Sequence, residues 1–124
     1  VIGNGDITSV PLAASRRAES GCAGLMVGRG LLGNPWLVRD MARHFAGLPP
    51  LPAPSRAEIC RIACRHLRRQ VELLGEMMGV MRSHLPFYLK GLPGAAAMRG
   101  GLNSLNEAAA VEQALREFLL KDLD

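Results

Sequence analysis

The sequence predicts an α/β segment followed by an all-helical domain, and three observations support this prediction. Two short apolar stretches flank a helical pattern near the start of the chain, which is the order strand, helix, strand. Four prolines fall within residues 47–54, a composition typical of a stiff, extended linker. From residue 55 onward, the apolar residues recur only at helical spacing.

The first domain is expected over residues 1–46. Val1–Gly3 is predicted to be a short strand, and Asn4-Gly5-Asp6 has the composition of a turn. A helix follows, because Thr8 or Ser9 can accept hydrogen bonds from the amides of its first turn. Gly21 is typical of the residue at which such a helix ends.

A second strand is predicted at Leu25–Val27, followed by a glycine turn at residues 28–30. Two consecutive strands joined through a helix are parallel, and parallel strands need further neighbours to be covered. We therefore expect the rest of the sheet to lie outside this chain, whose first residues are already strand-like. A further helix begins at Asn34-Pro35-Trp36 and continues to about Phe45.

The second domain, residues 55–124, is expected to consist of helices alone. Ser55–Glu58 forms a capping box, and the helix after it carries an apolar stripe that reaches Met78, where Gly79 interrupts it. The next helix is expected at residues 80–90, with a bend or restart at Pro86. After a turn at residues 91–94, a short helix is expected to reach Met98 or Arg99 and to be broken by Gly100-Gly101. The last helix is expected to begin after a cap at Ser104 or Asn106.

Positive charge is concentrated in the first part of that domain. The whole chain has a net charge of +4, and residues 55–104 alone carry eight Lys and Arg against three Glu. A basic block of this kind indicates a polyanionic partner such as RNA, although a solvated helix surface has a similar composition. The run Met77, Met78, Met81 is expected to fill the core.

The three cysteines match no zinc-binding spacing, so no metal site is expected. Cys60 and Cys64 share a helix face, which favours small buried side chains over metal ligands. This cysteine usage suits a reducing, cytoplasmic location. No signal peptide is visible, and no apolar run approaches the roughly 20 residues that a membrane-spanning helix needs.

The two glycine turns are the strongest chemical feature. Each follows a parallel strand, so both are expected at the carboxyl edge of the sheet, where ligands bind. Glycines allow backbone amides to approach an anion closely, and Arg29 offers a forked cationic donor. Either turn alone could be purely structural, but together they predict a phosphate-binding site.

Residues 1–7, 24–30 and 33–36 resemble the end of the barrel in the tRNA-dihydrouridine synthase family, and residues 81–91 and 94–103 are similar to parts of its helical tRNA-binding domain. The resemblance implies the last β/α units of a TIM (β/α)8 barrel followed by an all-α helical bundle. It implies FMN as the cofactor, NADPH as its reductant, and reduction of the uridine C5–C6 bond in tRNA. The implied FMN contacts are Asn4, Gly5, Asp6, Gly28 and Arg29.

The family's catalytic cysteine lies earlier in the barrel, and none of Cys22, Cys60 and Cys64 has a matching context. No catalytic residue is therefore assigned in this chain, which is expected to be inactive alone. The predicted tRNA phosphate contacts are Arg82, Lys90 and Arg99, followed by Arg61, Arg65 and Arg68. Two other functions stay open: another FMN-dependent barrel oxidoreductase acting on a small molecule, and a non-catalytic RNA-binding module.

Overall fold

The computed structural model describes residues 1–121, and their contacts divide the chain into two compact units, Val1–Ala53 and Pro54–Asp124. Residues 47–55 between the last helix of the first unit and the first helix of the second contain no helix or strand.

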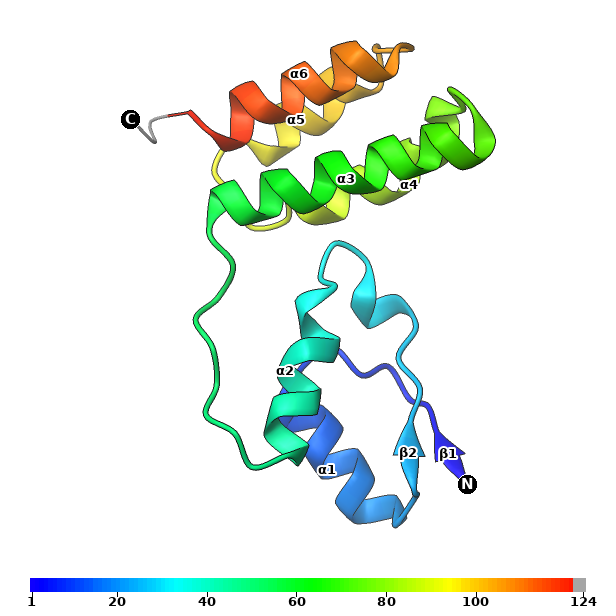
Figure 1. Ribbon diagram of the computed structural model, residues 1–124, viewed down its shortest axis with the longest axis vertical. Helices are drawn as coiled ribbons and strands as arrows, with labels where there is room; N and C mark the ends of the chain where they lie inside the picture. Colours follow the sequence, from blue (N-terminus) through cyan, green and yellow to red (C-terminus); the bar gives the residue numbers. More distant parts are fainter. Residues whose placement is uncertain (122–124) are drawn as a thin grey trace. The chain divides into compact units, whose positions relative to one another are not determined.

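The first unit contains a two-stranded parallel sheet and two helices (Figure 1). Strand β1 (Ile2–Gly3) pairs with β2 (Gly24–Leu25), with Ile2 opposite Gly24 and Gly3 opposite Leu25. The other elements are α1 (Val10–Ser20), the 3-10 turn η1 (Arg29–Leu31) and α2 (Trp36–Phe45).

Helix α1 begins and ends as its sequence predicts. Ser9 is the N-cap, and its hydroxyl accepts a hydrogen bond from the Leu12 amide at 3.3 Å. Gly21 adopts the left-handed conformation with φ 64°, and its amide donates to the Arg17 carbonyl at 2.9 Å. The core beneath this helix contains four buried side chains: Ile7, Ala13, Leu37 and Met41.

The second strand is shorter than predicted and displaced toward the N-terminus. It ends at Leu25, because β1 offers only two residues for pairing. The Met26 amide still donates to the Gly3 carbonyl at 2.7 Å, while its side chain is 57% exposed. Val27 packs against the core of the first unit without belonging to the strand.

The second unit is a bundle of four helices (Figure 1). They are α3 (Arg56–Leu74), α4 (Met78–Tyr88), α5 (Ala95–Leu102) and α6 (Ala108–Leu119). The most extensive helix–helix contact in this unit is between α3 and α6, and α4 and α5 complete the bundle. The largest fully buried side chains of this unit are Leu67, Met81, Leu89, Leu115, Leu119, Cys60 and Cys64.

The boundary between α3 and α4 differs from the prediction. Helix α3 ends at Leu74 because Gly75 adopts a positive φ of 74°, which glycine tolerates better than other residues. Met78 starts α4 and Gly79 lies inside it, so Gly79 does not interrupt a helix. As a result Met77 is 56% exposed, and its predicted place in the core is wrong, whereas Met78 and Met81 are buried.

The predicted breaks further along the chain are also wrong. Gly100 and Gly101 lie inside α5, where burial of Leu102 at its end outweighs their low helix propensity. Helix α6 has Glu107 at its N-cap position, because the two expected caps bond elsewhere. The Ser104 hydroxyl donates to the Gly101 carbonyl at 2.8 Å, and Asn106 accepts from Arg82.

Pro86 is accommodated within α4, which neither restarts nor ends there.

The start of α3 and the end of α6 are tied together. The Arg56 guanidinium donates to the Phe118 carbonyl and lies over the Phe118 ring, 5.6 Å from its centroid. No helix in the described part of the chain is long and apolar enough to cross a membrane.

Candidate functional site

The two glycine turns of the first unit meet in space. The Arg29 guanidinium in the second turn donates a hydrogen bond to the Asp6 carboxylate in the first, across 23 residues of sequence. Both side chains are exposed, with accessibilities of 81% and 72%. The predicted candidates Asp6 and Arg29 therefore lie together, and the parallel pairing of β1 with β2 brings their turns to the same edge.

The backbone of these turns is open toward an anion. Among the described residues, the amides of Gly5, Asp6 and Gly28 have no hydrogen-bond acceptor. A side chain added at Gly5 or Gly28 would meet no atom within 4 Å, so space lies beside both glycines. Asp6 has a φ of 46°, which is unusual for a residue with a side chain and occurs often at functional sites.

A third glycine has a packing role that sequence reasoning missed. A Cβ atom placed at Gly30 would overlap the backbone carbonyl oxygen of Ile7. The second turn therefore approaches the first so closely that only glycine fits at this position. Ile7 is 2% exposed, which anchors the contact to the core of the first unit.

A small cavity adjoins the first turn. It has a volume of about 90 Å³, and its lining residues are Gly3, Asn4, Gly5, Ile7, Arg16, Ser20 and Leu25. The predicted residues Asn4 and Gly5 thus share this cavity with Arg16 of α1. Arg16 pairs with Glu19 at 3.9 Å, an ordinary helix-surface spacing that gave no sequence signal for a site.

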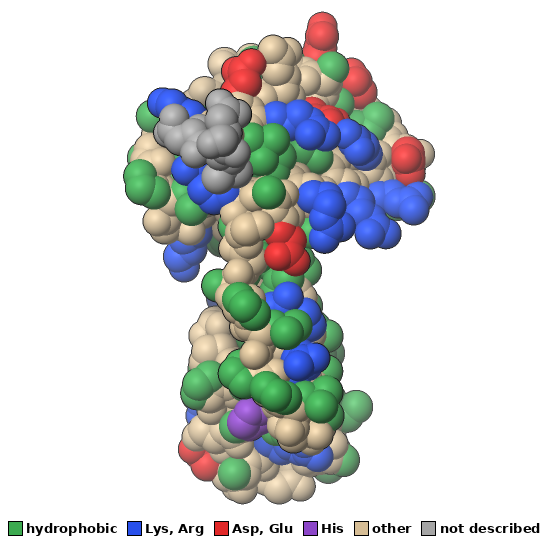
Figure 2. Space-filling model, turned by 60° about the vertical axis from the view of Figure 1, so that its left-hand side comes forward, with side chains coloured by type: hydrophobic (Ala, Val, Ile, Leu, Met, Phe, Trp, Pro, Cys, Tyr) green, Lys and Arg blue, Asp and Glu red, His purple; other side chains and the backbone are tan. Residues whose placement is uncertain are grey.

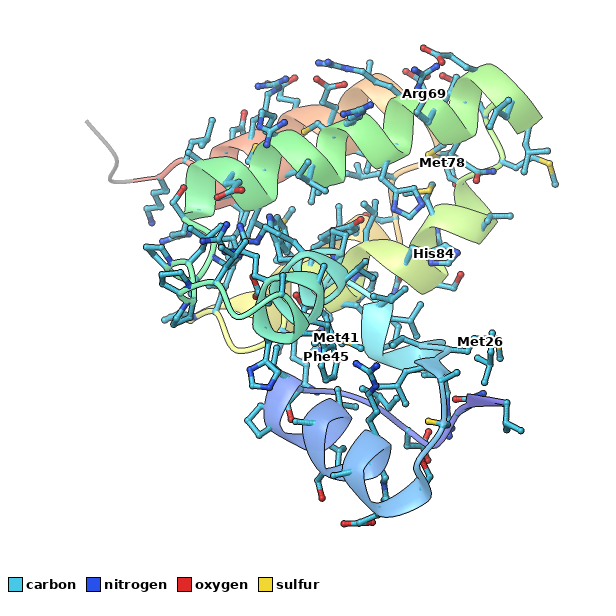
Figure 3. The ribbon with its side chains drawn as sticks, turned by 60° about the horizontal axis from the view of Figure 1, so that its bottom comes forward. Met26, Met41, Phe45, Arg69, Met78 and His84 are labelled. Atoms are coloured by element: carbon cyan, nitrogen blue, oxygen red, sulfur yellow. The ribbon has the colours of Figure 1, made fainter. Side chains whose placement is uncertain are left out.

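A larger cavity of about 300 Å³ in the same unit has a different character. Apolar side chains from β2, η1 and α2 line it, together with Arg17. The Arg17 guanidinium lies 4.7 Å from the centroid of the Phe45 ring, and Figure 3 shows Phe45 and Met41 on the same helix. None of the five predicted FMN contacts lines this cavity, and its lining is apolar apart from Arg17, so it is distinct from the predicted phosphate site.

The six predicted RNA contacts in the second unit fall into two groups. Arg61, Arg65, Lys90 and Arg99 are exposed and have no acidic partner among the described residues. Arg82 and Arg68 are engaged within the unit. Figure 2 shows Lys and Arg side chains gathered on one face of this unit.

Arg82 ties α4 to the connection between α5 and α6. Its Nη2 donates to the Leu105 carbonyl at 3.0 Å and to Asn106 Oδ1 at 2.7 Å. Its Nε is buried without a hydrogen-bond partner. The same side chain would have to share or exchange these donors in order to contact a phosphate.

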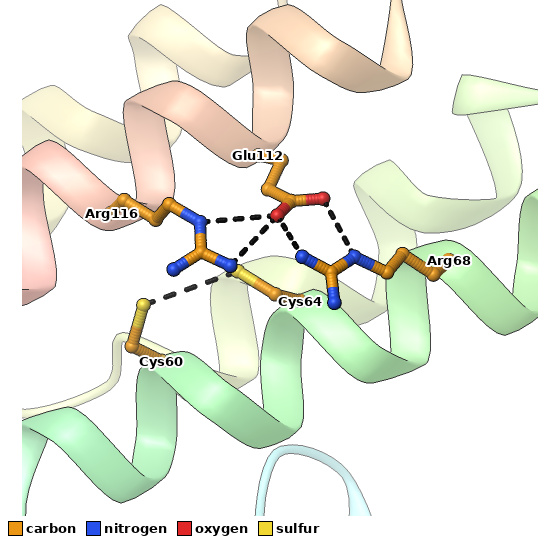
Figure 4. Close-up of polar contacts among 5 residues, drawn as sticks. All are labelled: Cys60, Cys64, Arg68, Glu112 and Arg116. Atoms are coloured by element: carbon orange, nitrogen blue, oxygen red, sulfur yellow. Dashed lines mark hydrogen bonds and ion pairs between the residues drawn. The ribbon is translucent and has the colours of Figure 1, made fainter.

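Arg68 belongs to an ion-pair group between α3 and α6 (Figure 4). Both Arg68 and Arg116 donate to the carboxylate of Glu112, which is 21% exposed. Hydrogen bonding from Arg68, the largest effect, lowers the pKa of Glu112, while Glu112 raises the pKa of each arginine. Sequence reasoning did not single out Arg116 or Glu112.

Two cysteines lie beneath this group. The sulfurs of Cys60 and Cys64 are 3.9 Å apart, and both side chains are buried, as their spacing predicted. Burial, followed by the neighbouring Cys60, raises the pKa of Cys64 to about 12, so this thiol stays neutral. No group of three or more potential metal ligands occurs within residues 1–121.

Two histidines and a tyrosine form a polar cluster between α3 and α4. Tyr88 is buried, and its hydroxyl lies 3.0 Å from His66 Nδ1. The ring centroids of His66 and His84 are 5.2 Å apart, and Figure 3 shows His84 on α4. Tyr88 therefore packs between helices, while His84 is half-buried at the edge of the cluster.

This cluster makes stability depend on pH. Burial, and then the neighbouring His84, lower the pKa of His66 below its usual value. The unfolded chain therefore binds this proton more readily, and stability falls as the pH drops below about 6.5. In thermal unfolding, the melting temperature is expected to fall less between pH 8 and pH 5 in His66→Gln than in the wild type. His44→Gln is the control, because His44 is exposed on α2. Equal decreases in melting temperature in all three proteins would contradict the role of His66.

Comparison with known proteins gives a consistent result. The family model for dihydrouridine synthase (Dus) matches residues 1–123. A "Probable tRNA-dihydrouridine synthase" of Rickettsia typhi is 37% identical over 126 residues, which cover 100% of this chain and 38% of the relative. A "tRNA-dihydrouridine synthase B" of Pseudomonas putida is 35% identical over 120 residues, or 95% of this chain and 36% of the relative.

A third relative, from Mycobacterium leprae, carries the name "Probable tRNA-dihydrouridine synthase". It is 38% identical over 104 residues, which cover 82% of this chain and 27% of that protein. The chain thus spans between 27% and 38% of the length of these three curated relatives. The family match nevertheless runs through both units, from the glycine turns into the helical bundle, and the chain belongs to the dihydrouridine synthase family.

Proposed function

We propose that this chain is the C-terminal part of a tRNA-dihydrouridine synthase, which reduces the C5–C6 bond of a tRNA uridine with FMN and NADPH. The single observation that carries the proposal is the junction of Asp6 with Arg29 in a chain of this family. It brings together two turns with unpaired amides at one edge of a parallel sheet. Such an edge is the usual ligand site of α/β folds.

The residues of the two turns fit the phosphate end of FMN. The amides of Gly5, Asp6 and Gly28 lack acceptors, and open space lies beside both glycines. Asp6 holds one edge of the Arg29 guanidinium, which leaves other N–H donors for a phosphate oxygen. Asn4 adds an amide side chain at the neighbouring cavity. When bound, FMN would supply the hydride for uridine reduction.

The first unit corresponds, in this proposal, to the last β/α units of a TIM barrel. Strands β1 and β2 pair only with each other here, and two parallel strands need neighbours on both edges in a closed barrel. The groups that reduce and protonate the uracil ring would come from the remainder of that barrel. The chain alone is then a cofactor-holding and RNA-holding part without its reacting centre.

The helical unit is proposed to hold the tRNA by its phosphates. Within residues 1–121, no acidic partner engages Lys90, Arg99, Arg61 or Arg65. Arg82 and Arg68 would contribute donors beyond those already engaged. Phe87 is 42% exposed on α4 and offers a ring on which a base can stack. Contacts of this kind fix position and supply affinity without reading sequence. A tRNA substrate also favours a cytoplasmic location.

The test of this proposal uses the complete protein that contains this segment. It should bind FMN and convert uridine to dihydrouridine in tRNA when NADPH is supplied, as measured by nucleoside mass spectrometry. Arg29→Gln removes a charge-assisted hydrogen bond worth about 1.5–3 kcal/mol and should weaken FMN binding roughly 10- to 100-fold. Arg43→Gln, which removes the same charge from α2, should leave FMN affinity unchanged.

Two results would contradict the proposal. Unchanged FMN affinity in Arg29→Gln would remove the assigned phosphate site, and transfer of hydride to a small molecule but not to tRNA would favour a different barrel oxidoreductase. The amount of bound flavin is read from its visible absorbance, which is independent of turnover.

A further inference from the structure

We propose that Arg68 and Arg116 form a two-guanidinium clamp for the RNA backbone, organised by Glu112 at the α3–α6 seam. The inference rests on the proposed tRNA partner and adds a residue, Arg116, and a docking surface to it. This surface is built from α3 and α6, whereas the segment that resembles the family's tRNA-binding region lies on α4.

The two oxygens of the Glu112 carboxylate accept different numbers of hydrogen bonds from the two arginines. Glu112 Oε1 accepts from Arg116 Nε at 3.1 Å and Nη2 at 2.9 Å, and also from Arg68 Nη2. Glu112 Oε2 accepts only from Arg68 Nε, at 3.1 Å. Both oxygens of the Glu112 carboxylate already accept hydrogen bonds from Arg68, so Arg116 adds a second positive charge to a carboxylate that is already paired. The hydrogen bonds of both guanidinium groups to Glu112 use Nε and Nη2, which leaves the Nη1 group of each for another acceptor.

The exposure of the three groups puts the cations outermost. The side chains of Arg68 and Arg116 are 57% and 46% exposed, whereas Glu112 is 21% exposed. An anion that approaches the seam therefore meets guanidinium groups first. One carboxylate holds both in place, which reduces the side-chain freedom that binding would otherwise have to remove.

The surroundings add positive charge. Arg61 and Arg65 lie on the same exposed stretch of α3 and have no acidic partner among the described residues. Helices α3 and α6 together carry six arginines against four glutamates (Glu58, Glu72, Glu112 and Glu117), so the two helices keep a net charge of +2. Arg61, Arg65 and Arg68 extend over about 10 Å of helix, which is longer than one phosphate and suits a nucleic-acid backbone.

The floor of the clamp carries no compensating negative charge. Cys60 and Cys64 lie beneath the two arginines and are buried, and burial raises the pKa of Cys64 to about 12, so the Cys64 thiol stays protonated at neutral pH. An apolar, uncharged floor screens the guanidinium charges less than water does. The attraction for a phosphate above the seam is correspondingly stronger.

A purely structural role for the group makes a different prediction. A bridge that only joined α3 to α6 would need one arginine, and exposed ion pairs of this kind stabilise a protein little. Replacing Arg116 should then change RNA binding no more than replacing any other exposed cation. Replacing it in a clamp should remove one phosphate contact.

The experiment measures the affinity of the complete protein that contains this chain for unmodified tRNA at several salt concentrations. Arg116→Gln should lower the slope of log K against log salt by about 0.7–0.9, the value for one phosphate contact. Lys121→Gln is the matched control, since Lys121 is exposed beyond the end of α6 and carries the same charge. Its slope should equal that of the wild type, and the melting temperature of both variants should stay within about 2 °C of it.

Arg116→Lys separates charge from structure. Lysine keeps the phosphate-neutralising charge but not the forked bonds to Glu112, so its slope should return to the wild-type value. Equal slopes for Arg116→Gln and Lys121→Gln would overturn the clamp while leaving the proposed function intact. Equal loss in Arg116→Lys and Arg116→Gln would also overturn it, in favour of a structural role. Failure of the wild-type complete protein to bind tRNA at any salt concentration would instead contradict the proposed tRNA partner.

Discussion

Replacing Leu67 by alanine is expected to lower the free energy of unfolding of the helical unit by about 2–5 kcal/mol. Leu67 lies in the middle of α3 and is 1% exposed. Truncation would remove its buried methyl groups and leave a cavity that neighbouring side chains cannot fill completely. Urea unfolding followed by circular dichroism at 222 nm, where helices dominate the signal, gives the change directly.

The same helix provides the control. Leu73 is 78% exposed, so Leu73→Ala makes the same chemical change without creating a cavity. Its effect is expected to stay within about 0.5 kcal/mol. Similar losses in the two variants would show that α3 does not bury the face described here.

Replacing Gly30 by alanine is expected to disrupt the contact between the two glycine turns. The added methyl group would overlap the Ile7 carbonyl. Its position is fixed by the backbone of residue 30, and the carbonyl is itself backbone, so neither group can rotate away. Overpacking costs about 1–3 kcal/mol where side chains can adjust, and a backbone obstruction should lie at the upper end or beyond. Amide exchange of residues 3–31, measured by NMR, should become faster.

Gly28 is the matched control for this change. It lies two residues earlier in the same turn, and a Cβ atom there would meet nothing within 4 Å. Gly28→Ala should therefore leave amide exchange in the first unit almost unchanged. Equal acceleration in both variants would mean that the turn needs flexible glycines and has no close contact with Ile7.

The order of helices and strands was largely predictable because it depends on local signals. The cap at Ser9 and the left-handed Gly21 fix the ends of α1 from within a few residues of sequence. The end of α3 was misplaced because the choice between Gly75 and Gly79 depends on which glycine the packing places at positive φ. Gly100 and Gly101 were misread because burial of Leu102 is a tertiary effect.

The candidate site was predictable in its residues and less so in its contacts. The glycine turns marked Asp6 and Arg29, and their parallel strands implied one common edge, but no pattern announced that the two side chains would pair. The role of Glu112 was invisible because its partner Arg68 lies 44 residues away. Asn106 looked like a helix cap until the position of Arg82 was known.

The bond from Arg56 to the Phe118 carbonyl joins the first residue of α3 to the penultimate residue of α6. The two ends of the helical unit therefore lie next to each other, and its path through space is nearly a closed ring. A short peptide could link the ends, and new ends could be opened at the exposed turn around Gly91 and Gly94. A circularly permuted helical unit with these new ends is therefore expected to keep the same packing of α3 against α6.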